Sequence, residues 1–242
     1  MKISGLQKVS TIDYPGEIAC TIFLHGCNFR CGFCYNPELV LGSSESGVGS
    51  REKGGFSEEY VLDFLKSRIG KLDAVCITGG EPLVSLDFDF VRKIRDLGFK
   101  IKLDTNGSFP NRLKEMIDLG LVDYIAMDIK NSREKYSEAV GVNIDIEKIE
   151  ESIKMIHDFG EYEFRTTTVG RLHDAYSMMA MAKWLNSVCG AKPKRFFLQG
   201  FKKNPDGMID SSYMDELDVG EKFLIELKNC ISDWFEKVEV RV

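Results

Sequence analysis

The sequence lacks the long hydrophobic runs that cross membranes or direct a chain to export. No stretch of about 18 or more apolar residues occurs, and the amino-terminal "MKISGLQKVS" has no apolar core of the signal-peptide kind. An excess of basic residues is also absent, because 32 lysines and arginines are interleaved with 38 aspartates and glutamates, giving a formal net charge of -6. These absences argue against membrane and nucleic-acid partners and favour a cytoplasmic protein.

The sequence also lacks an even set of cysteines. Seven are present, at positions 20, 27, 31, 34, 76, 189 and 230, and this odd, scattered set fits a reducing compartment better than a disulfide framework. Three of them, Cys27, Cys31 and Cys34, fall within "HGCNFRCGFC" (25–34). No second group of cysteines follows at 35–57, so we expect a single metal or redox site.

Internal repeats are not visible either, but strand and helix patterns alternate along all 242 residues. Apolar, β-branched runs at 18–25, 74–78, 101–104, 124–129, 163–169 and 195–199 predict strands. Helical patterns follow at 57–70, 85–98, 111–120, 146–160, 175–188 and 219–235, with Ser57 as an N-cap and Gly98, Gly120 and Gly160 as C-terminal caps.

Six strand–helix units predict an α/β fold in which outer helices cover a parallel sheet. We expect a partial (βα)6 TIM-like barrel formed by residues 1–242 as a single domain, with an open sheet as the alternative. "KVEVRV" (237–242) predicts one further edge strand, and the Gly- and Ser-rich stretch at 42–55 predicts a mobile loop.

Polar residues directly follow the predicted strands. The three cysteines follow the first strand, "TGGEP" (78–82) the second and "DTNG" (104–107) the third, while "DIK" (128–130) ends the fourth. Arg165 lies in the fifth strand and Gln199 ends the sixth. The carboxyl ends of parallel strands carry the chemistry in such folds, so a functional site is predicted there.

The three cysteines leave two kinds of metal site open. In a [4Fe–4S] cluster held by three thiolates, one iron has no protein ligand, and an open coordination position is typical of catalysis. The alternative is a structural zinc site that takes its fourth ligand from His25 or Cys20. Those two residues lie on the preceding strand at an odd separation, and therefore on opposite faces, which disfavours the zinc site.

Several motifs resemble those of one enzyme family. The spacing from Cys27 to Cys34, with Phe33 before the third cysteine, resembles the cluster loop of radical S-adenosylmethionine (SAM) enzymes, and "GGEP" (79–82) resembles their methionine-binding motif. The leader "STIDYPGEIACTIFLHGCNFRCGFCYNPEL" (10–39) is similar to that of glycyl radical enzyme activases. The resemblance is to the anaerobic ribonucleoside-triphosphate reductase or pyruvate formate-lyase activating type.

This resemblance implies an anaerobic oxidoreductase with a [4Fe–4S] cluster on Cys27, Cys31 and Cys34. Such an enzyme cleaves SAM reductively and abstracts hydrogen from a glycine of a partner glycyl radical enzyme. The expected partner is anaerobic ribonucleotide reductase, and the expected electron donor is flavodoxin or ferredoxin. One alternative is a small-molecule enzyme similar to 7-carboxy-7-deazaguanine synthase, and another is a metal-binding module without radical chemistry.

The same resemblance implies the cofactor-binding residues. Gly79 and Gly80, which carry no Cβ, would let the methionine amine approach the backbone, and Glu81 would hold the local geometry. Lys130 and Arg165 would face the cofactor carboxylate; the alternatives are a surface lysine and an Arg165–Glu163 pair.

Two carboxylates at neighbouring strand ends repel each other unless a cation joins them. The resemblance implies a monovalent cation near Asp104, Thr105 and Asp128, and ordinary helix capping is the alternative. Phe33, Tyr35 and Gln199 would lie near the adenine, although many relatives have histidine in place of Tyr35. His173, in a polar loop, is expected to be structural or solvated.

Overall fold

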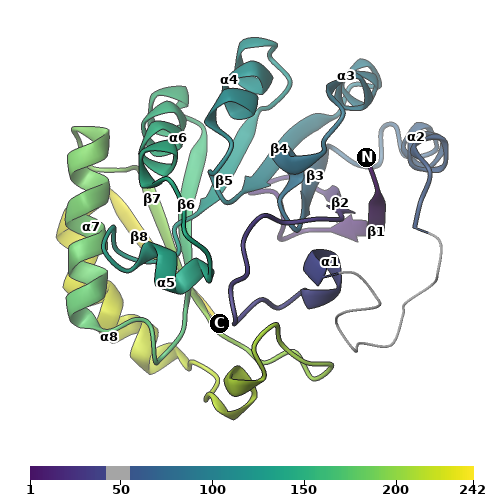
Figure 1. Cartoon of the computed structure of the whole chain (residues 1–242). Helices are drawn as coiled ribbons and strands as arrows, with labels where there is room; N and C mark the ends of the chain where they lie inside the picture. Colours follow the sequence, from purple (N-terminus) through teal and green to yellow (C-terminus); the bar gives the residue numbers. More distant parts are fainter. Residues whose placement is uncertain (42–54) are drawn as a thin grey trace. The chain divides into compact units, whose positions relative to one another are not determined.

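The computed structural model describes residues 1–41 and 55–242, which form an α/β fold (Figure 1). Among these residues, strands β1 to β8 are ordered in the sheet as they are in the chain. The chain divides into two compact units, of which the first comprises residues 1–28, 38–105 and 111–125 and the second comprises 29–37, 106–110 and 126–242. The predicted loop at 42–55 lies, apart from Gly55, outside the described residues, and the single domain stays a prediction.

The first unit is built on β1 (Ile3–Ser10), β2 (Ala19–Leu24), β3 (Ala74–Gly79) and β4 (Lys100–Thr105). The last three are parallel, and β1 is antiparallel to β2. β1 was not predicted from the sequence: it has no continuous apolar run, and only Ile3 and Ser10 at its two ends are buried. The helical elements are α1 (Pro37–Leu41), α2 (Glu58–Lys66), η1 (Pro82–Val84), α3 (Phe88–Asp96) and nearly all of α4 (Pro110–Asp118), and α2 packs beside α3 (Figure 1).

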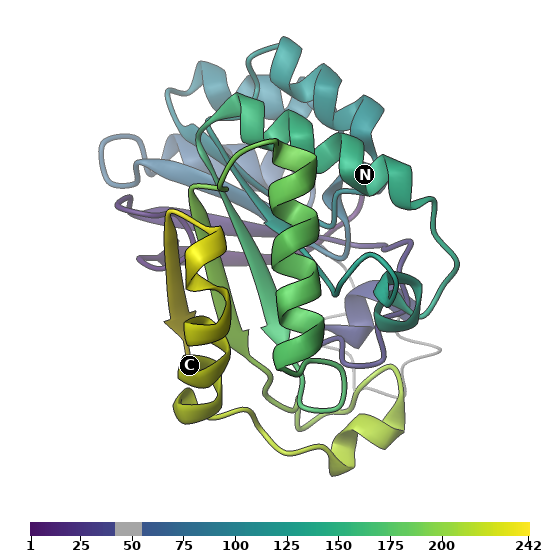
Figure 2. The same cartoon turned by 90° about the vertical axis from the view of Figure 1, so that its left-hand side faces the viewer.

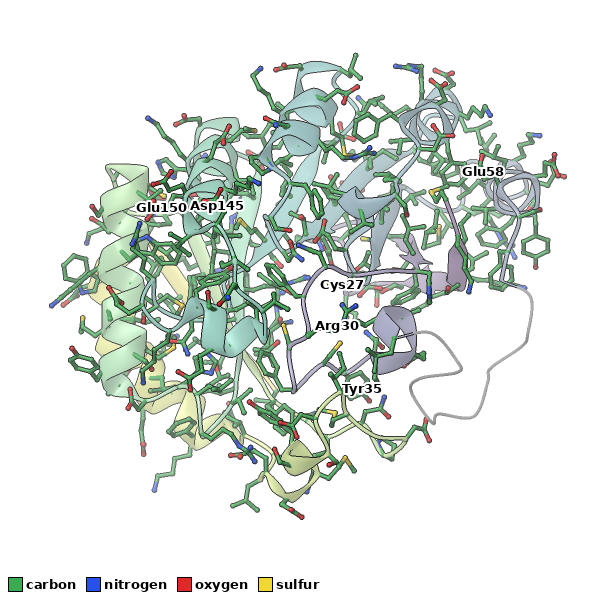
Figure 3. All side chains as sticks on the ribbon, viewed as in Figure 1. Cys27, Arg30, Tyr35, Glu58, Asp145 and Glu150 are labelled. Carbon is green, nitrogen blue, oxygen red and sulfur yellow. The ribbon has the colours of Figure 1, made fainter. Side chains whose placement is uncertain are left out.

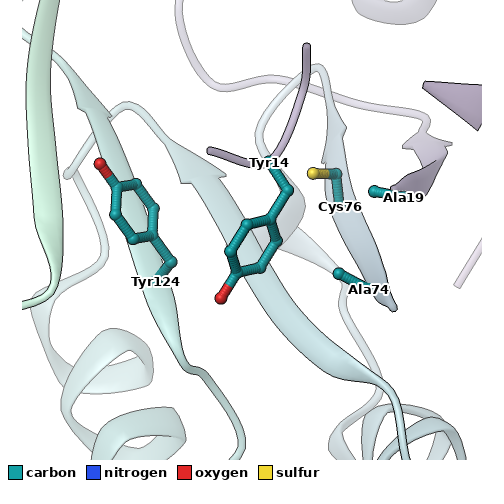
Figure 4. Packing of buried hydrophobic residues seen from close by; sticks show 5 residues of the cluster. All are labelled: Tyr14, Ala19, Ala74, Cys76 and Tyr124. Atoms are coloured by element: carbon teal, nitrogen blue, oxygen red, sulfur yellow. The ribbon is translucent and has the colours of Figure 1, made fainter. Parts of the chain in front are cut away.

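Tyr14, from the leader, covers the amino ends of several strands in this unit. Its ring centroid lies 5.7 Å from that of Tyr124, and the two rings pack with Ala19, Ala74 and Cys76 (Figure 4). Ala19, Ala74 and Tyr124 are the first residues of β2, β3 and β5 (Tyr124–Asp128). The leader tyrosine therefore fills the hydrophobic core at the strand ends opposite to those that carry the predicted site residues.

The second unit contains most of β5, followed by β6 (Tyr162–Thr168), β7 (Arg195–Gly200) and β8 (Lys237–Arg241). β6, β7 and β8 are parallel, and β8 is the last strand of the sheet, which confirms the predicted edge strand. Helix α7 (Ala175–Cys189) packs against both α6 (Ile146–Phe159) and α8 (Glu221–Ile231) (Figure 2). Shorter elements are α5 (Tyr136–Val140), η2 (Ser211–Asp215) and η3 (Ser232–Trp234).

The predicted class, six strand–helix units with parallel strands and outer helices, is confirmed. The Ser57 hydroxyl accepts a hydrogen bond from the Tyr60 amide at 3.1 Å, as an N-cap does, and Gly98, Gly120 and Gly160 have positive φ. Helix α5 was missed because five residues are too few to show a helical period. Within the described residues, no helix is long and apolar enough to cross a membrane.

Candidate active site

The cysteine loop follows β2, and Figure 3 labels Cys27, Arg30 and Tyr35 along it. The loop passes from the first unit to the second after residue 28, so Cys27 belongs to the first unit and Cys31 and Cys34 to the second. At its start, the Gly26 amide donates to the Leu39 carbonyl at 2.7 Å. Since Leu39 lies in α1, this bond fixes the residue before Cys27 to the helix at the far end of the loop.

Gly79 and Gly80 lie in close contact with the backbone of residues 24–26, which precedes Cys27. Gly79 has φ +130, and an ideal Cβ on it would lie 2.2 Å from the Leu24 carbonyl oxygen. A Cβ on Gly80 would lie 2.1 Å from the Gly26 carbonyl oxygen and 3.1 Å from the Cys27 Cβ. No L side chain fits at either position without moving the backbone, so both glycines are required by the entry of the cysteine loop.

Glu81 is fully buried, and both its backbone amide and its side-chain carboxylate form hydrogen bonds. Its amide donates to the Gly26 carbonyl at 2.8 Å. Its carboxylate accepts from the Leu83 amide at 3.0 Å, which caps η1, and from the Thr105 hydroxyl at 2.8 Å. Glu81 therefore ties the carboxyl end of β4 to the turn after β3, in agreement with the local structural role expected for it.

Asp104, beside Thr105 on β4, pairs with Lys102, whose side chain is only 3% exposed. The alternation of side chains along a strand places these two residues on the same face. Asp104 thus accepts a hydrogen bond from a nearly buried ammonium on its own strand. Sequence reasoning missed Lys102, although its i, i+2 spacing to Asp104 was visible.

In the second unit, the Cys31–Cys34 part of the loop forms a turn. The Cys34 amide donates to the Cys31 carbonyl at 3.0 Å, and a bond of this kind keeps the two Cα atoms within about 7 Å. The preceding Arg30 amide donates to the Val140 carbonyl at 2.8 Å, and an ideal Cβ on Gly141 would lie 2.3 Å from the Arg30 carbonyl oxygen. The end of α5 therefore supports this half of the loop.

The three residues predicted near the adenine have different surroundings. Phe33 is buried, and its ring centroid lies 6.0 Å from that of Tyr213. Tyr35 is 54% exposed, with its carbonyl bonded to the Asn204 side-chain amide at 2.7 Å. Gln199 is half-buried at the end of β7, where it pairs with Thr167 of β6. A stacking surface at Phe33 is thus already covered in part by a protein ring.

Asp128, Lys130 and Arg165 form a compact ionic group between the carboxyl end of β5 and the middle of β6. Asp128 accepts from Lys130 Nζ at 2.9 Å and from Arg165 Nε, and the three side chains are 26%, 13% and 14% exposed. Burial alone would raise the pKa of Asp128, but Arg165 and Lys130 outweigh it and lower that pKa. Burial by itself would lower the pKa of Lys130, but the negative charge of Asp128 outweighs burial and raises that pKa. Both Asp128 and Lys130 therefore stay charged.

These contacts correct three of the alternatives considered from the sequence. Lys130 is not a surface lysine, and Asp128 is paired with cations rather than with a helix end. The principal anion beside Arg165 is Asp128 rather than Glu163, which stands 3.9 Å away and makes two 2.9 Å bonds with Arg241. Together, three cations and two carboxylates leave one net positive charge in this region, which suits an anionic ligand group.

His173 is buried, 1% exposed, and is structural rather than solvated. Its Nδ1 accepts from the Val169 amide at 2.9 Å, so the proton is on Nε2, which faces the Lys130 carbonyl at 2.9 Å. Burial lowers the pKa of His173 to about 4. This neutral imidazole fixes the backbone of Lys130 and joins it to the end of β6.

All seven cysteines lie in the described residues, and none forms a disulfide. No group of three or more His, Cys, Asp or Glu side chains is gathered as a metal site in 1–41 and 55–242. Cys20 does not fit a zinc site with the loop, because burial raises its pKa to about 12 and it precedes Leu24 by four residues of strand, roughly 13 Å. As a donor set, the free thiols of Cys27, Cys31 and Cys34 have the chemistry that a [4Fe–4S] cluster with three protein ligands requires.

The site residues are thus divided between the units. Cys27 lies in the first unit with Gly79, Gly80, Glu81, Asp104 and Thr105. Cys31 and Cys34 lie in the second with Phe33, Tyr35, Asp128, Lys130, Arg165 and Gln199. Gly79, Thr105 and Asp128 are the last residues of β3, β4 and β5, and Gln199 is the second-last of β7, whereas Arg165 lies in the middle of β6. Their roles toward a cofactor stay predictions.

Comparison with known proteins gives this geometry a family context. The family model described as Radical SAM superfamily matches residues 21–183. A protein of Methanocaldococcus jannaschii, named for glycyl-radical enzyme activation, is 34% identical over 218 residues, which cover 84% of this chain and 85% of the relative. The pyruvate formate-lyase-activating enzyme of Listeria monocytogenes is 26% identical over 136 residues, and the match spans about half of each protein, 53% in both cases.

Solved structures show the same fold. The crystal structure of QueE from Escherichia coli superposes with a TM-score of 0.55 at 16% identity, covering 100% of this chain and 93% of that one. At this level of identity the likeness concerns the fold alone. The sheet of mostly parallel strands with outer helices is the partial TIM-like fold of these proteins, so the predicted fold class is confirmed.

Proposed function

The chain belongs to the radical SAM superfamily and is of the glycyl-radical enzyme activating type, and from this premise we propose that it generates a glycyl radical on a partner enzyme. The finer parts of the proposal are anaerobic ribonucleotide reductase as the partner, flavodoxin or ferredoxin as the electron donor, and a cytoplasmic location. The observation that carries it is the three-cysteine loop after β2, in a chain similar over 84% of its length to a glycyl-radical enzyme activating relative.

The family implies a [4Fe–4S] cluster and SAM as cofactors. We propose Cys27, Cys31 and Cys34 as the cluster ligands; the reduced cluster would supply one electron to break a carbon–sulfur bond of the SAM sulfonium. Support comes from the turn that holds Cys31 and Cys34 together and from the buried glycine contacts that fix Cys27. Three thiolates leave one iron open for the methionine end of SAM.

The remaining residues would bind and orient SAM. The net positive region of Lys130 and Arg165 suits its carboxylate, because a buried cation needs a nearby anion. Gly79, Gly80 and Glu81 would present backbone to the methionine end. The residues proposed to border the adenine are Phe33, Tyr35 and Gln199.

A monovalent cation near Asp104, Thr105 and Asp128 has the weakest support. The sequence argument required uncompensated carboxylates, yet Asp104 already pairs with Lys102, and Asp128 with Lys130 and Arg165. Omission of potassium and sodium from the buffer tests it. The cation predicts weaker SAM binding without them, whereas unchanged binding would remove it from the proposal.

The test of the proposed function is anaerobic reconstitution with iron and sulfide, followed by reduction in the presence of SAM. We expect a cluster and release of 5′-deoxyadenosine from the native chain, both lost in Cys31→Ala. Cys230→Ala, which alters a cysteine on α8, is the matched control and should behave as the native chain does. Tight zinc binding with no cluster would contradict the proposal.

A second step separates the two enzymatic alternatives. The activase predicts a glycyl radical signal by electron paramagnetic resonance when anaerobic ribonucleotide reductase is added to the reduced enzyme and SAM. The alternative is the small-molecule enzyme similar to 7-carboxy-7-deazaguanine synthase that the sequence also allows. Formation of 7-carboxy-7-deazaguanine from its precursor, without any protein radical, would favour that alternative.

A further inference from the structure

Residues 201–216, which follow β7, pack on the Cys31–Cys34 half of the cysteine loop in the second unit. The Asp210 amide donates to the Gly32 carbonyl at 3.2 Å, and the Asn204 side-chain amide donates to the Tyr35 carbonyl at 2.7 Å. The first bond reaches Gly32, within the Cys31–Cys34 turn, and the second reaches Tyr35, directly after it. A stretch far away in the sequence therefore controls the path of the loop on both sides of Cys34.

Tyr213 makes the closest contact between this stretch and the loop. An ideal Cβ on Gly32 would lie 2.6 Å from Tyr213 Cε2, so the ring occupies the space where any side chain at position 32 would go. The ring also packs against Phe33, with centroids 6.0 Å apart, and is 8% exposed. The residue between Cys31 and Phe33 is thus a glycine because a tyrosine fills its side-chain position.

The Tyr213 ring is itself packed against Arg171 and Phe201. The Arg171 guanidinium lies 4.2 Å from its ring centroid and is fixed by bonds to Glu216 Oε2 at 2.6 Å, the Ser212 hydroxyl at 3.0 Å and the Ser212 carbonyl at 2.7 Å. Phe201 packs edge-on from another side, with centroids 6.4 Å apart. A ring held on several sides cannot swing away, so it acts as a fixed wall beside the loop.

The Tyr213 ring lies against the residue that follows a proposed cluster ligand, because Gly32 comes directly after Cys31. Cys31 is buried, 9% exposed. Groups that orient metal ligands and exclude water around them tune both the retention and the potential of the metal centre.

We propose that Tyr213 is a positioning residue for the iron–sulfur cluster. Its ring, packed on Gly32 and Phe33, holds the Cys31–Cys34 turn in shape and keeps water from that side of the cluster. This inference rests on the proposed function, because it concerns a cluster bound by these cysteines. It assigns a role to a residue that belongs to none of the motifs in the sequence.

The experiment compares Tyr213→Ala and Tyr213→Phe with the native chain after anaerobic reconstitution. The readouts are the rate of iron loss to a chelator and the midpoint potential of the cluster from a titration followed by electron paramagnetic resonance. We expect Tyr213→Ala to lose iron about tenfold faster and to shift the potential upward, because water stabilises the extra negative charge of the reduced cluster. Tyr213→Phe, which keeps the ring, should restore both values.

Three further variants keep the test independent of general unfolding. Tyr176→Ala removes an 81% exposed tyrosine of α7 and should leave both readouts at the native values. Gly32→Ala should also speed iron loss, since its Cβ would meet Tyr213, and this effect should shrink in Gly32→Ala/Tyr213→Ala.

The outcomes separate this inference from the proposed function. A native chain that binds a cluster, together with a Tyr213→Ala variant of unchanged iron loss and potential, would overturn the role of Tyr213 alone. A native chain that binds no cluster would overturn the proposed function and this inference with it. Equal effects of Gly32→Ala with and without the Tyr213 ring would also count against the proposed contact.

Discussion

The two units carry polar residues at the same place, the carboxyl ends of parallel strands, but hold them by different physical means. In the first unit, Gly79 and Gly80 leave no room for a Cβ, and Glu81 bonds to amides and a hydroxyl. In the second, Asp128 is held by the charges of Lys130 and Arg165. The two glycines of the first unit thus depend on close backbone packing, whereas Asp128 of the second depends on charge compensation.

This difference indicates which changes each region tolerates. A packed backbone is sensitive to added atoms, because interiors have little free volume. A buried ionic group is sensitive to the loss of one charge, because the remaining charges are left without compensation. The two regions should therefore respond oppositely to substitutions that alter volume and substitutions that alter charge.

The largest effect should come from removing the central charge of the second unit. Asp128→Asn leaves Lys130 and Arg165 facing each other, and we expect a loss of about 3 kcal/mol in the free energy of unfolding, measured by urea denaturation. Asp89→Asn is the control, because Asp89 pairs with Arg92 on the surface of α3 and should cost less than about 1 kcal/mol. If both variants lose the same free energy of unfolding, the ionic group at Asp128 is no more important for stability than a surface ion pair.

A volume change should act on the first unit. Gly80→Ala places a Cβ 2.1 Å from the Gly26 carbonyl oxygen, and we expect a cost of about 1–3 kcal/mol together with lower iron content after reconstitution. Gly220→Ala, at the start of α8, is the matched control because nothing lies within 4 Å of its Cβ position. If Gly80→Ala keeps the native stability and iron content, the backbone at Gly26 can move to make room for the added Cβ.

The second unit should also respond to pH through His173. Its pKa of about 4 in the folded chain lies below the ordinary value of 6.5, so the unfolded chain binds the extra proton first and stability falls as pH decreases from 7 towards 4. Between pH 7 and pH 5 we expect a loss of about 2 kcal/mol from this residue. His173→Gln should flatten that part of the pH profile, and an unchanged slope would exclude the histidine as its source.

The smallest effect should come from a single hydrogen bond in the first unit. Thr105→Val removes the hydroxyl that donates to Glu81 Oε1 while keeping the shape of the side chain, and we expect a cost of about 1 kcal/mol by thermal unfolding. Thr105→Ser retains the donor and should cost less. If serine costs more than valine, packing of the threonine methyl outweighs the hydrogen bond.

The residues that could be predicted from the sequence are those marked by local patterns. Apolar, β-branched runs and capping residues predicted every strand except β1 and most of the helices, and short motifs located the cysteine loop and the two glycines. Contacts between distant segments could not be predicted, because no local pattern encodes them. Tyr213 and Gly32 are an example, and Lys102 and His173 are polar residues whose burial depends on neighbours in space.

Because contacts between distant segments could not be predicted, residues that the sequence did single out have other neighbours than expected. Gly79 and Gly80 were identified as positions that need glycine, but the atoms that require it in the structure belong to Leu24 and Gly26. Arg165 was expected to need an anion, and Asp128 supplies it from a neighbouring strand. Composition and spacing thus indicated the need for a partner, while the fold determined which partner is present.

The packing of Tyr14 on Tyr124 has a consequence for the order of events during synthesis. The two rings are separated by 110 residues in the chain, so the ring that closes the amino ends of β2 and β3 waits for a distant strand to emerge. At ribosomal speed this delay is on the order of 5–20 s. A nascent chain stalled before residue 124 would therefore present an uncovered aromatic side chain to chaperones and proteases.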